Sequence, residues 1–113
     1  MKFLLQVYFN SAQQPLERLT EDERQAIVDE YTAFFRSPGI IDGHQLQPPT
    51  TATTVRSEDG QPTRSAGPVH SGAPLGGYYL VDVDDLDAAL TLAARVPAVR
   101  MGGAVEVRPV VTR

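Results

Sequence analysis

The sequence contains no cysteine and no tryptophan, and only two methionines among its 113 residues. The lack of cysteine excludes disulfide bonds, thiolate catalysis and cysteine-ligated zinc or iron–sulfur centres. No apolar run approaches the ~20 residues of a membrane-spanning helix. The N-terminal stretch FLLQVYFN is too short and too interrupted for the apolar core of a signal peptide. We therefore expect a cytoplasmic protein with no membrane association.

Basic residues are also scarce. Ten Lys and Arg stand against fourteen Asp and Glu, so the formal net charge is −4, and the basic residues are scattered without a run. Sequence-independent nucleic-acid binding needs a basic surface that displaces counterions, so no nucleic-acid partner is expected. The apolar share of 42% is that of a globular protein, and the length suits a single domain over residues 1–113.

Two amphipathic segments predict helices, and alternating or β-branched segments predict strands. Thr20 and Glu23 fit a capping box at the start of the first helix, 20–36. Its apolar residues recur every three or four positions, which predicts a stripe that faces the core. The pair Asp84-Asp85 fits the start of the second helix. The predicted strands are 3–9, 40–46, 50–57, 78–83 and 104–111, with a possible edge strand near 62–66 in a loop (61–75) long enough to be a lid.

This order of elements predicts an α+β, ferredoxin-like fold: βαββαβ with an extra edge strand, and both helices on one face of an antiparallel sheet. The other face is left open, and it combines apolar with polar side chains. Such a face is too apolar to leave in water, so we expect two copies to meet through it as a homodimer that encloses a polar-lined cavity. The side chains expected on this open face are Leu4, Gln6, Tyr8, Tyr78, Leu80, Glu106, Arg108 and Val110.

Four blocks of sequence carry a family resemblance: MKFLLQVY at the start, LQPPTTATTVR at 46–56, GGYYLVDVDDLDAALTLAARVPA at 76–98 and VEVRPV at 105–110. In this order and spacing they resemble the YCII-related, or DGPF-domain, family over nearly the whole chain. The resemblance implies a dimeric α+β barrel formed by two ferredoxin-like sheets. Relatives resemble small-molecule enzymes such as muconolactone isomerases and dehydrochlorinases, or accessory proteins encoded beside extracytoplasmic-function sigma factors.

The signature loop of that family departs from its usual form in this chain. Where the family reads Asp-Gly-Pro-Phe, this sequence reads Ala66-Gly67-Pro68-Val69. The glycine and the proline preserve the turn, but the carboxylate and the aromatic ring are absent. No role of that aspartate can be carried over to this protein.

Proton-transfer chemistry would fall to His44 or His70, because only histidine titrates near neutrality without help. Strand alternation places Asp42 and His44 on one face, so the carboxylate can orient the imidazole of a general base. The alternative is a histidine at a strand end that is exposed or merely hydrogen-bonded. His70 could reach over a pocket from its loop, or it could be a solvated loop residue.

The predicted substrate contacts are Tyr8, Gln6, Tyr78 and Arg108, with His70. Each has an alternative: the tyrosines can serve dimer packing, and Arg108 can pair with Glu106 at the surface. Aspartates crowd the start of the second helix, where this residue type is favoured for capping, so neither a metal site nor a cofactor is expected. These aspartates are Asp82, Asp84, Asp85 and Asp87.

Together these observations predict a homodimer that binds a small organic ligand. If it is an enzyme, His44 and Asp42 would catalyse an isomerisation, elimination or cyclisation without a cofactor. The alternative is a non-catalytic accessory or regulatory protein, for which a link to an extracytoplasmic-function sigma factor is one option. A structural dimer without a ligand is a third possibility.

Overall fold

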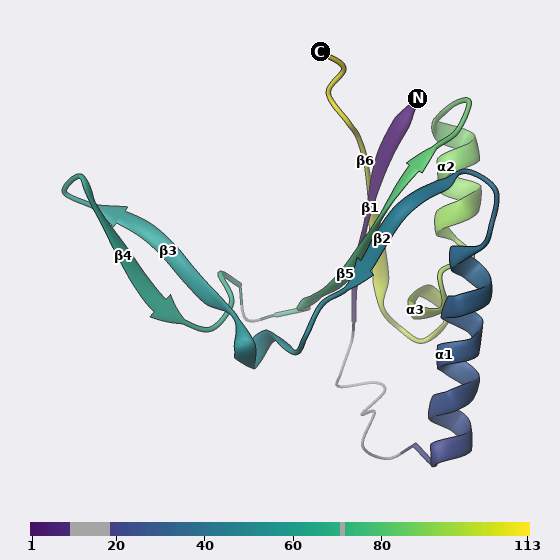
Figure 1. Cartoon of the computed structure of the whole chain (residues 1–113), viewed down its shortest axis with the longest axis horizontal. Helices are drawn as coiled ribbons and strands as arrows, with labels where there is room; N and C mark the ends of the chain where they lie inside the picture. The colour runs from purple at the N-terminus through teal and green to yellow at the C-terminus, as the bar shows by residue number, and fades with distance from the viewer. Residues whose placement is uncertain (10–18, 71) are drawn as a thin grey trace.

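The main body is a four-stranded antiparallel sheet with helices on one face, in a computed structural model that describes residues 1–9, 19–70 and 72–113 (Figure 1). The spatial order β2-β5-β1-β6, with every neighbouring pair antiparallel, is that of a ferredoxin-like sheet. The predicted α+β, ferredoxin-like fold is thus confirmed. The four strands are β1 (Lys2–Tyr8), β2 (Ile40–Gln45), β5 (Leu75–Asp82) and β6 (Ala104–Pro109).

The two longer helices begin where the sequence provides caps. The Glu23 amide donates to the Thr20 hydroxyl at 3.1 Å, and the Thr20 amide donates to the Glu23 carboxylate at 3.2 Å, so the predicted capping box is confirmed. Asp85 accepts the Ala88 amide hydrogen at 2.9 Å at the start of the second helix. None of the described helices is long and apolar enough to cross a membrane. The helices are α1 (Glu21–Phe35), α2 (Leu86–Ala93) and α3 (Pro97–Arg100), with a 3-10 turn η2 (Pro49–Thr51).

The core lies between the helices and one face of the sheet. Phe3, Leu5 and Val7 alternate along β1 and are buried on the helix side. Of the predicted apolar stripe on α1, only Phe34 is buried, whereas Val28 and Phe35 are 53% and 43% exposed. The stripe does face the sheet, since its other members line a cavity between α1 and the strands, but it is not fully buried. The N-terminal half of α1 runs past the ends of the strands (Figure 1).

Residues 53–66 form a second, two-stranded sheet, which we call the arm. Strand β3 (Thr53–Glu58) pairs only with β4 (Gln61–Ala66), through a tight turn at Asp59-Gly60. The predicted extra edge strand therefore does not join the main sheet. Prolines lie on both sides of the arm, at 48–49 and 68, and they deprive the flanking backbone of N–H donors for the main sheet. The arm extends away from the body on the side opposite the helices (Figure 1).

Candidate functional site

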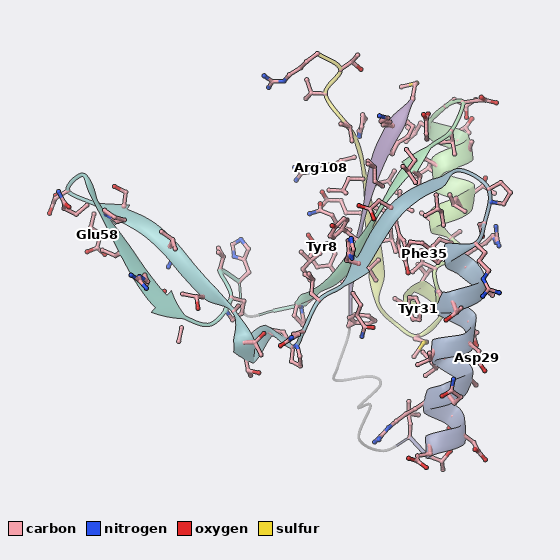
Figure 2. The ribbon with its side chains drawn as sticks, viewed as in Figure 1. Tyr8, Asp29, Tyr31, Phe35, Glu58 and Arg108 are labelled. Atoms are coloured by element: carbon pink, nitrogen blue, oxygen red, sulfur yellow. The ribbon has the colours of Figure 1, made fainter. Side chains whose placement is uncertain are left out.

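The strand register gathers six of the seven predicted site residues on the open face of the sheet. Directly opposed residues of antiparallel strands point to the same face, and two neighbouring rows cross all four strands. Tyr8 follows in the next row along β1 (Figure 2). From β2 to β6, the first row is Asp42, Leu80, Leu4 and Arg108, and the second is His44, Tyr78, Gln6 and Glu106.

His44 and Asp42 lie side by side at the β2 edge of this face. The distance from His44 Nε2 to Asp42 Oδ1 is 3.3 Å, so the carboxylate can stabilise a protonated imidazole. The ring of Tyr78 lies next to that of His44, with the centroids 5.7 Å apart. The His44 and Asp42 side chains are 63% and 54% exposed in the single chain. The pair has the geometry of an oriented general base on a surface that is still open.

Arg108 lies at the opposite edge of the same face, on β6. Its Nε donates to Glu106 Oε1 at 2.5 Å, so the ion pair considered as an alternative from the sequence is present. Both side chains are substantially exposed. An anionic ligand would have to compete with Glu106 for the guanidinium group.

The centre of the open face consists of half-buried side chains, while its two edges are exposed and charged. The helices α1, α2 and α3 lie on the other side of the sheet (Figure 1). This distribution, apolar in the middle and polar at the rim, is typical of surfaces that bind another molecule. The half-buried side chains are Leu4, Gln6, Tyr8, Tyr78 and Leu80.

His70 is exposed in the segment that follows the arm, and no hydrogen bond, ion pair or ring contact joins it to the open face in the described ranges. The altered signature loop keeps its turn. Gly67 has a φ of +99°, which favours glycine, and its carbonyl accepts a hydrogen bond from the Thr54 hydroxyl at 2.7 Å. The loop thus closes the base of the arm, and His70 stays apart from the other predicted residues.

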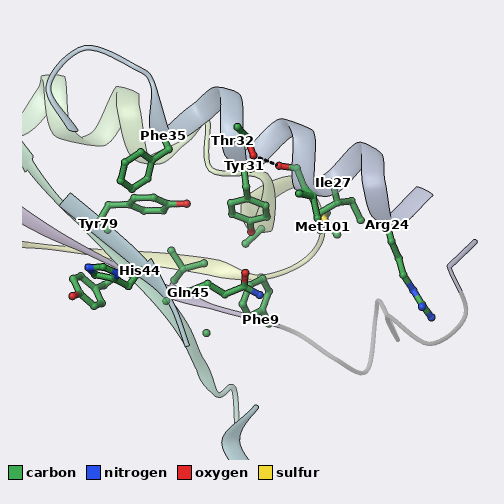
Figure 3. A pocket seen from close by; sticks show the side chains of 18 of the residues that line it. Phe9, Arg24, Ile27, Tyr31, Thr32, Phe35, His44, Gln45, Tyr79 and Met101 are labelled. Atoms are coloured by element: carbon green, nitrogen blue, oxygen red, sulfur yellow. Dashed lines mark hydrogen bonds between the residues drawn. The ribbon is translucent and has the colours of Figure 1, made fainter. Parts of the chain in front are cut away.

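A cavity of about 630 Å³ lies on the other face of the sheet, beneath α1 (Figure 3). Sequence reasoning missed it, although two glycines within strands carried a signal. A Cβ atom at Gly76 would lie 1.8 Å from the Phe9 ring, and one at Gly43 would lie 2.5 Å from the Tyr79 ring. The register of β2 against β5 shifts between Ile40 and Asp42. The cavity lining includes Val7, Phe9, Ile27, Tyr31, Phe35 and Tyr79.

The Tyr31 hydroxyl is the unusual polar group beside this cavity. It is buried and has no hydrogen-bond partner among the described residues. Burial raises the pKa of Tyr31 to about 12; Tyr79 acts in the same direction, and the Ala98 backbone opposes it. The group is therefore a neutral phenol at physiological pH, able to donate a hydrogen bond.

The aspartates near the start of α2 have structural contacts. Asp85 caps α2, as the sequence suggested. Asp82 Oδ1 accepts a hydrogen bond from the N-terminal ammonium group at 3.2 Å, which ties the first residue to the end of β5.

Comparison with known protein families places these features in context. A family model described as the YCII-related domain matches residues 1–112. The chain belongs to the YCII-related family. No curated protein matches the chain. Family membership confirms the resemblance carried by the four sequence blocks, and by itself it assigns no reaction.

Proposed function

We propose that this YCII-related protein is a homodimer that binds a small organic molecule between the open faces of two copies. The apolar centre of that face, with Leu4, Tyr78 and Leu80, supports association, because such side chains gain free energy when they leave water. Gln6 and Tyr8 lie among them, so a closed interface would leave hydrogen-bonding groups inside. A mixed lining of this kind suits an organic ligand with a few polar groups.

The single observation that carries an enzymatic reading is the 3.3 Å distance between His44 Nε2 and Asp42 Oδ1. In the proposed reaction the His44 imidazole takes a proton from the substrate, and the Asp42 carboxylate stabilises the imidazolium. The proton then returns to another atom in an isomerisation or cyclisation, or passes to the leaving group in an elimination. No cofactor takes part.

The remaining residues of the open face would position the substrate. Tyr8, Gln6 and Tyr78 offer hydroxyl and amide groups, and Arg108 would bind an anionic group in exchange for Glu106. His70 would contribute only if its segment closed over the bound molecule.

The first test separates assembly from ligand binding. Light scattering at micromolar concentration should give the mass of a dimer. A thermal-shift screen of small organic acids and lactones should then find ligands that stabilise the wild type more than His44→Ala, with His70→Ala as the matched control. A monomer would refute the dimer, and ligand shifts retained in full by His44→Ala would remove His44 from the site.

A non-catalytic accessory or regulatory protein is the second candidate. It is favoured by the exposure of both His44 and Asp42 in the single chain, and by the missing carboxylate and ring of the signature loop. Proton abstraction distinguishes the two. A ligand found in the screen, incubated with the protein in D₂O, should exchange a carbon-bound proton with the wild type and not with His44→Ala. Binding without exchange would favour the accessory role, including a link to a sigma factor.

A further inference from the structure

We propose that the arm (residues 53–66) is a clasp that packs on the second copy of the chain. This inference rests on the proposed homodimer. The arm has almost no support from its own chain: Thr54, at the base, is its one buried residue, and Val55 is 65% exposed. Glu58, at the tip, lies far from the body that carries Tyr8 (Figure 2). A two-stranded hairpin alone is marginally stable in water, so another surface must hold this one in place.

The two faces of the arm differ in chemistry. The register pairs Val55 with Arg64 and Ser57 with Pro62, so the valine, the proline and the aliphatic stem of the arginine share one face. The same face also carries Thr53, Ser57 and Ala66, and nothing in the described part of the chain covers it. The opposite face is polar throughout, with Thr54, Arg56, Glu58, Gln61, Thr63 and Ser65.

The surface of the whole chain is larger than that of a compact monomer. Its accessible area is 8156 Å², whereas a folded monomer of 12.3 kDa exposes about 6100 Å². The radius of gyration is 16.0 Å, against about 13 Å for a compact chain of this length. The excess of about 2000 Å² exceeds the ~800 Å² that each partner buries in a standard interface. The chain thus carries enough surplus surface for an extensive dimer.

The direction of the arm identifies the second copy as its partner. The arm extends from the side of the sheet opposite the helices (Figure 1), which is the side of the open face. When two open faces meet about a two-fold axis, each arm runs alongside the other copy. The clasp is therefore continuous with the proposed dimer interface, and the face of Val55 and Pro62 is the one that meets the partner.

The absence of cysteine allows a direct test with single introduced thiols. Val55→Cys and Arg56→Cys are neighbours on opposite faces of β3, and both positions are exposed in the single chain. In the dimer, maleimide should label Val55→Cys at least ~10-fold more slowly than Arg56→Cys, because interface cores exclude solvent. Equal rates in a sample shown to be dimeric by light scattering would refute the clasp alone. A monomeric wild type would refute the dimer as well.

Charge substitutions give an independent measurement. Val55→Asp should raise the dimer dissociation constant at least ~10-fold, because it places a charge in an apolar contact. Ser65→Asp, on the polar face at the same level of the arm, should change it less than ~2-fold. Sedimentation at several concentrations measures both constants, and circular dichroism checks that both variants fold. Equal effects of the two substitutions would contradict the proposed contact face.

Discussion

The two main helices cover the same sheet, yet they pack on it in different ways. α2 has 8 residues and buries three of them, Ala89, Leu92 and Ala93. α1 has 15 residues and buries only Phe34. Alanine side chains allow the axis of α2 to come close to the sheet, whereas Phe34 and its aromatic neighbours hold α1 away and leave the 630 Å³ cavity. The comparison suggests that the α2 half provides stability, while the α1 half has room for a ligand or for rearrangement.

Phe34 should be the anchor of α1, and its truncation should have the largest effect. Its ring makes an edge contact with Tyr79 at 5.0 Å and lies 5.9 Å from the Arg95 guanidinium. Phe34→Ala should lower the free energy of unfolding by about 3 kcal/mol, measured by urea denaturation. The neighbouring Phe35→Ala, at a 43% exposed position, is the control and should cost less than half as much. Equal losses would mean that Phe35 anchors α1 as strongly as Phe34 does.

Overpacking substitutions should show the second-largest effect, and they should destabilise the protein more in α2 than in α1. Ala89 belongs to α2 and is fully buried, so Ala89→Leu should destabilise the fold by about 2 kcal/mol. Ala33→Leu in α1 is the matched control, because Ala33 is exposed, and it should be close to neutral. If calorimetry gave similar melting temperatures for both variants, the close packing of α2 would be disproved.

Loss of the capping box should weaken α1 with an intermediate effect. Thr20→Ala removes the hydroxyl that accepts the Glu23 amide hydrogen, and it should cost about 1 kcal/mol in urea denaturation. Thr20→Ser, which keeps the acceptor, should retain most of the stability. If Thr20→Ser lost as much stability as Thr20→Ala, the Thr20 hydroxyl would not be the group that stabilises the start of α1.

Tyr31→Phe should have the smallest effect, and it should be stabilising. The substitution removes a buried hydroxyl without a described partner, so stability at pH 7 should rise by up to about 1 kcal/mol. Burial raises the folded-state pKa to about 12 from the usual 10, so the unfolded chain ionises first as the pH rises. The part of the free energy of unfolding that depends on a neutral Tyr31 phenol is therefore complete below pH 10, and it is lost between pH 10 and 12.

The measurement is a series of urea midpoints between pH 7 and 11. The wild type should lose stability above pH 10 more steeply than Tyr31→Phe. Tyr79, whose pKa burial also raises, remains in both proteins. Parallel curves would show that the Tyr31 hydroxyl is solvated in solution.

Sequence reasoning succeeded where the controlling interaction is local. The capping box at Thr20 involves residues three apart, and the shared face of Asp42 and His44 follows from the alternation of one strand. The two rows of side chains across the open face could be predicted once the strand order was known, and the ferredoxin-like pattern gives that order. The catalytic and ligand-binding roles of these residues stay predictions.

Reasoning from sequence failed where the position of one element over another decides the outcome. Val28 and Phe35 belong to an apolar stripe, but periodicity does not reveal that they border a cavity and stay partly exposed. The segment 62–66 had a strand pattern, and Asp59-Gly60 is a hairpin turn signal, but neither indicates that β3 and β4 pair only with each other.

By itself, the sequence determined the α+β class, the family, the starts of α1 and α2 and the side chains that share each strand face. These follow from backbone hydrogen bonding and from the periods of helix and strand, which a short stretch of chain already contains. Only the tertiary structure decided that the arm does not join the main sheet and that a cavity lies between α1 and the sheet. The cavity depends on how bulky side chains from distant segments, such as Phe9 over Gly76 and Tyr79 over Gly43, fill or leave space between elements. The position of the arm depends on the prolines that flank it.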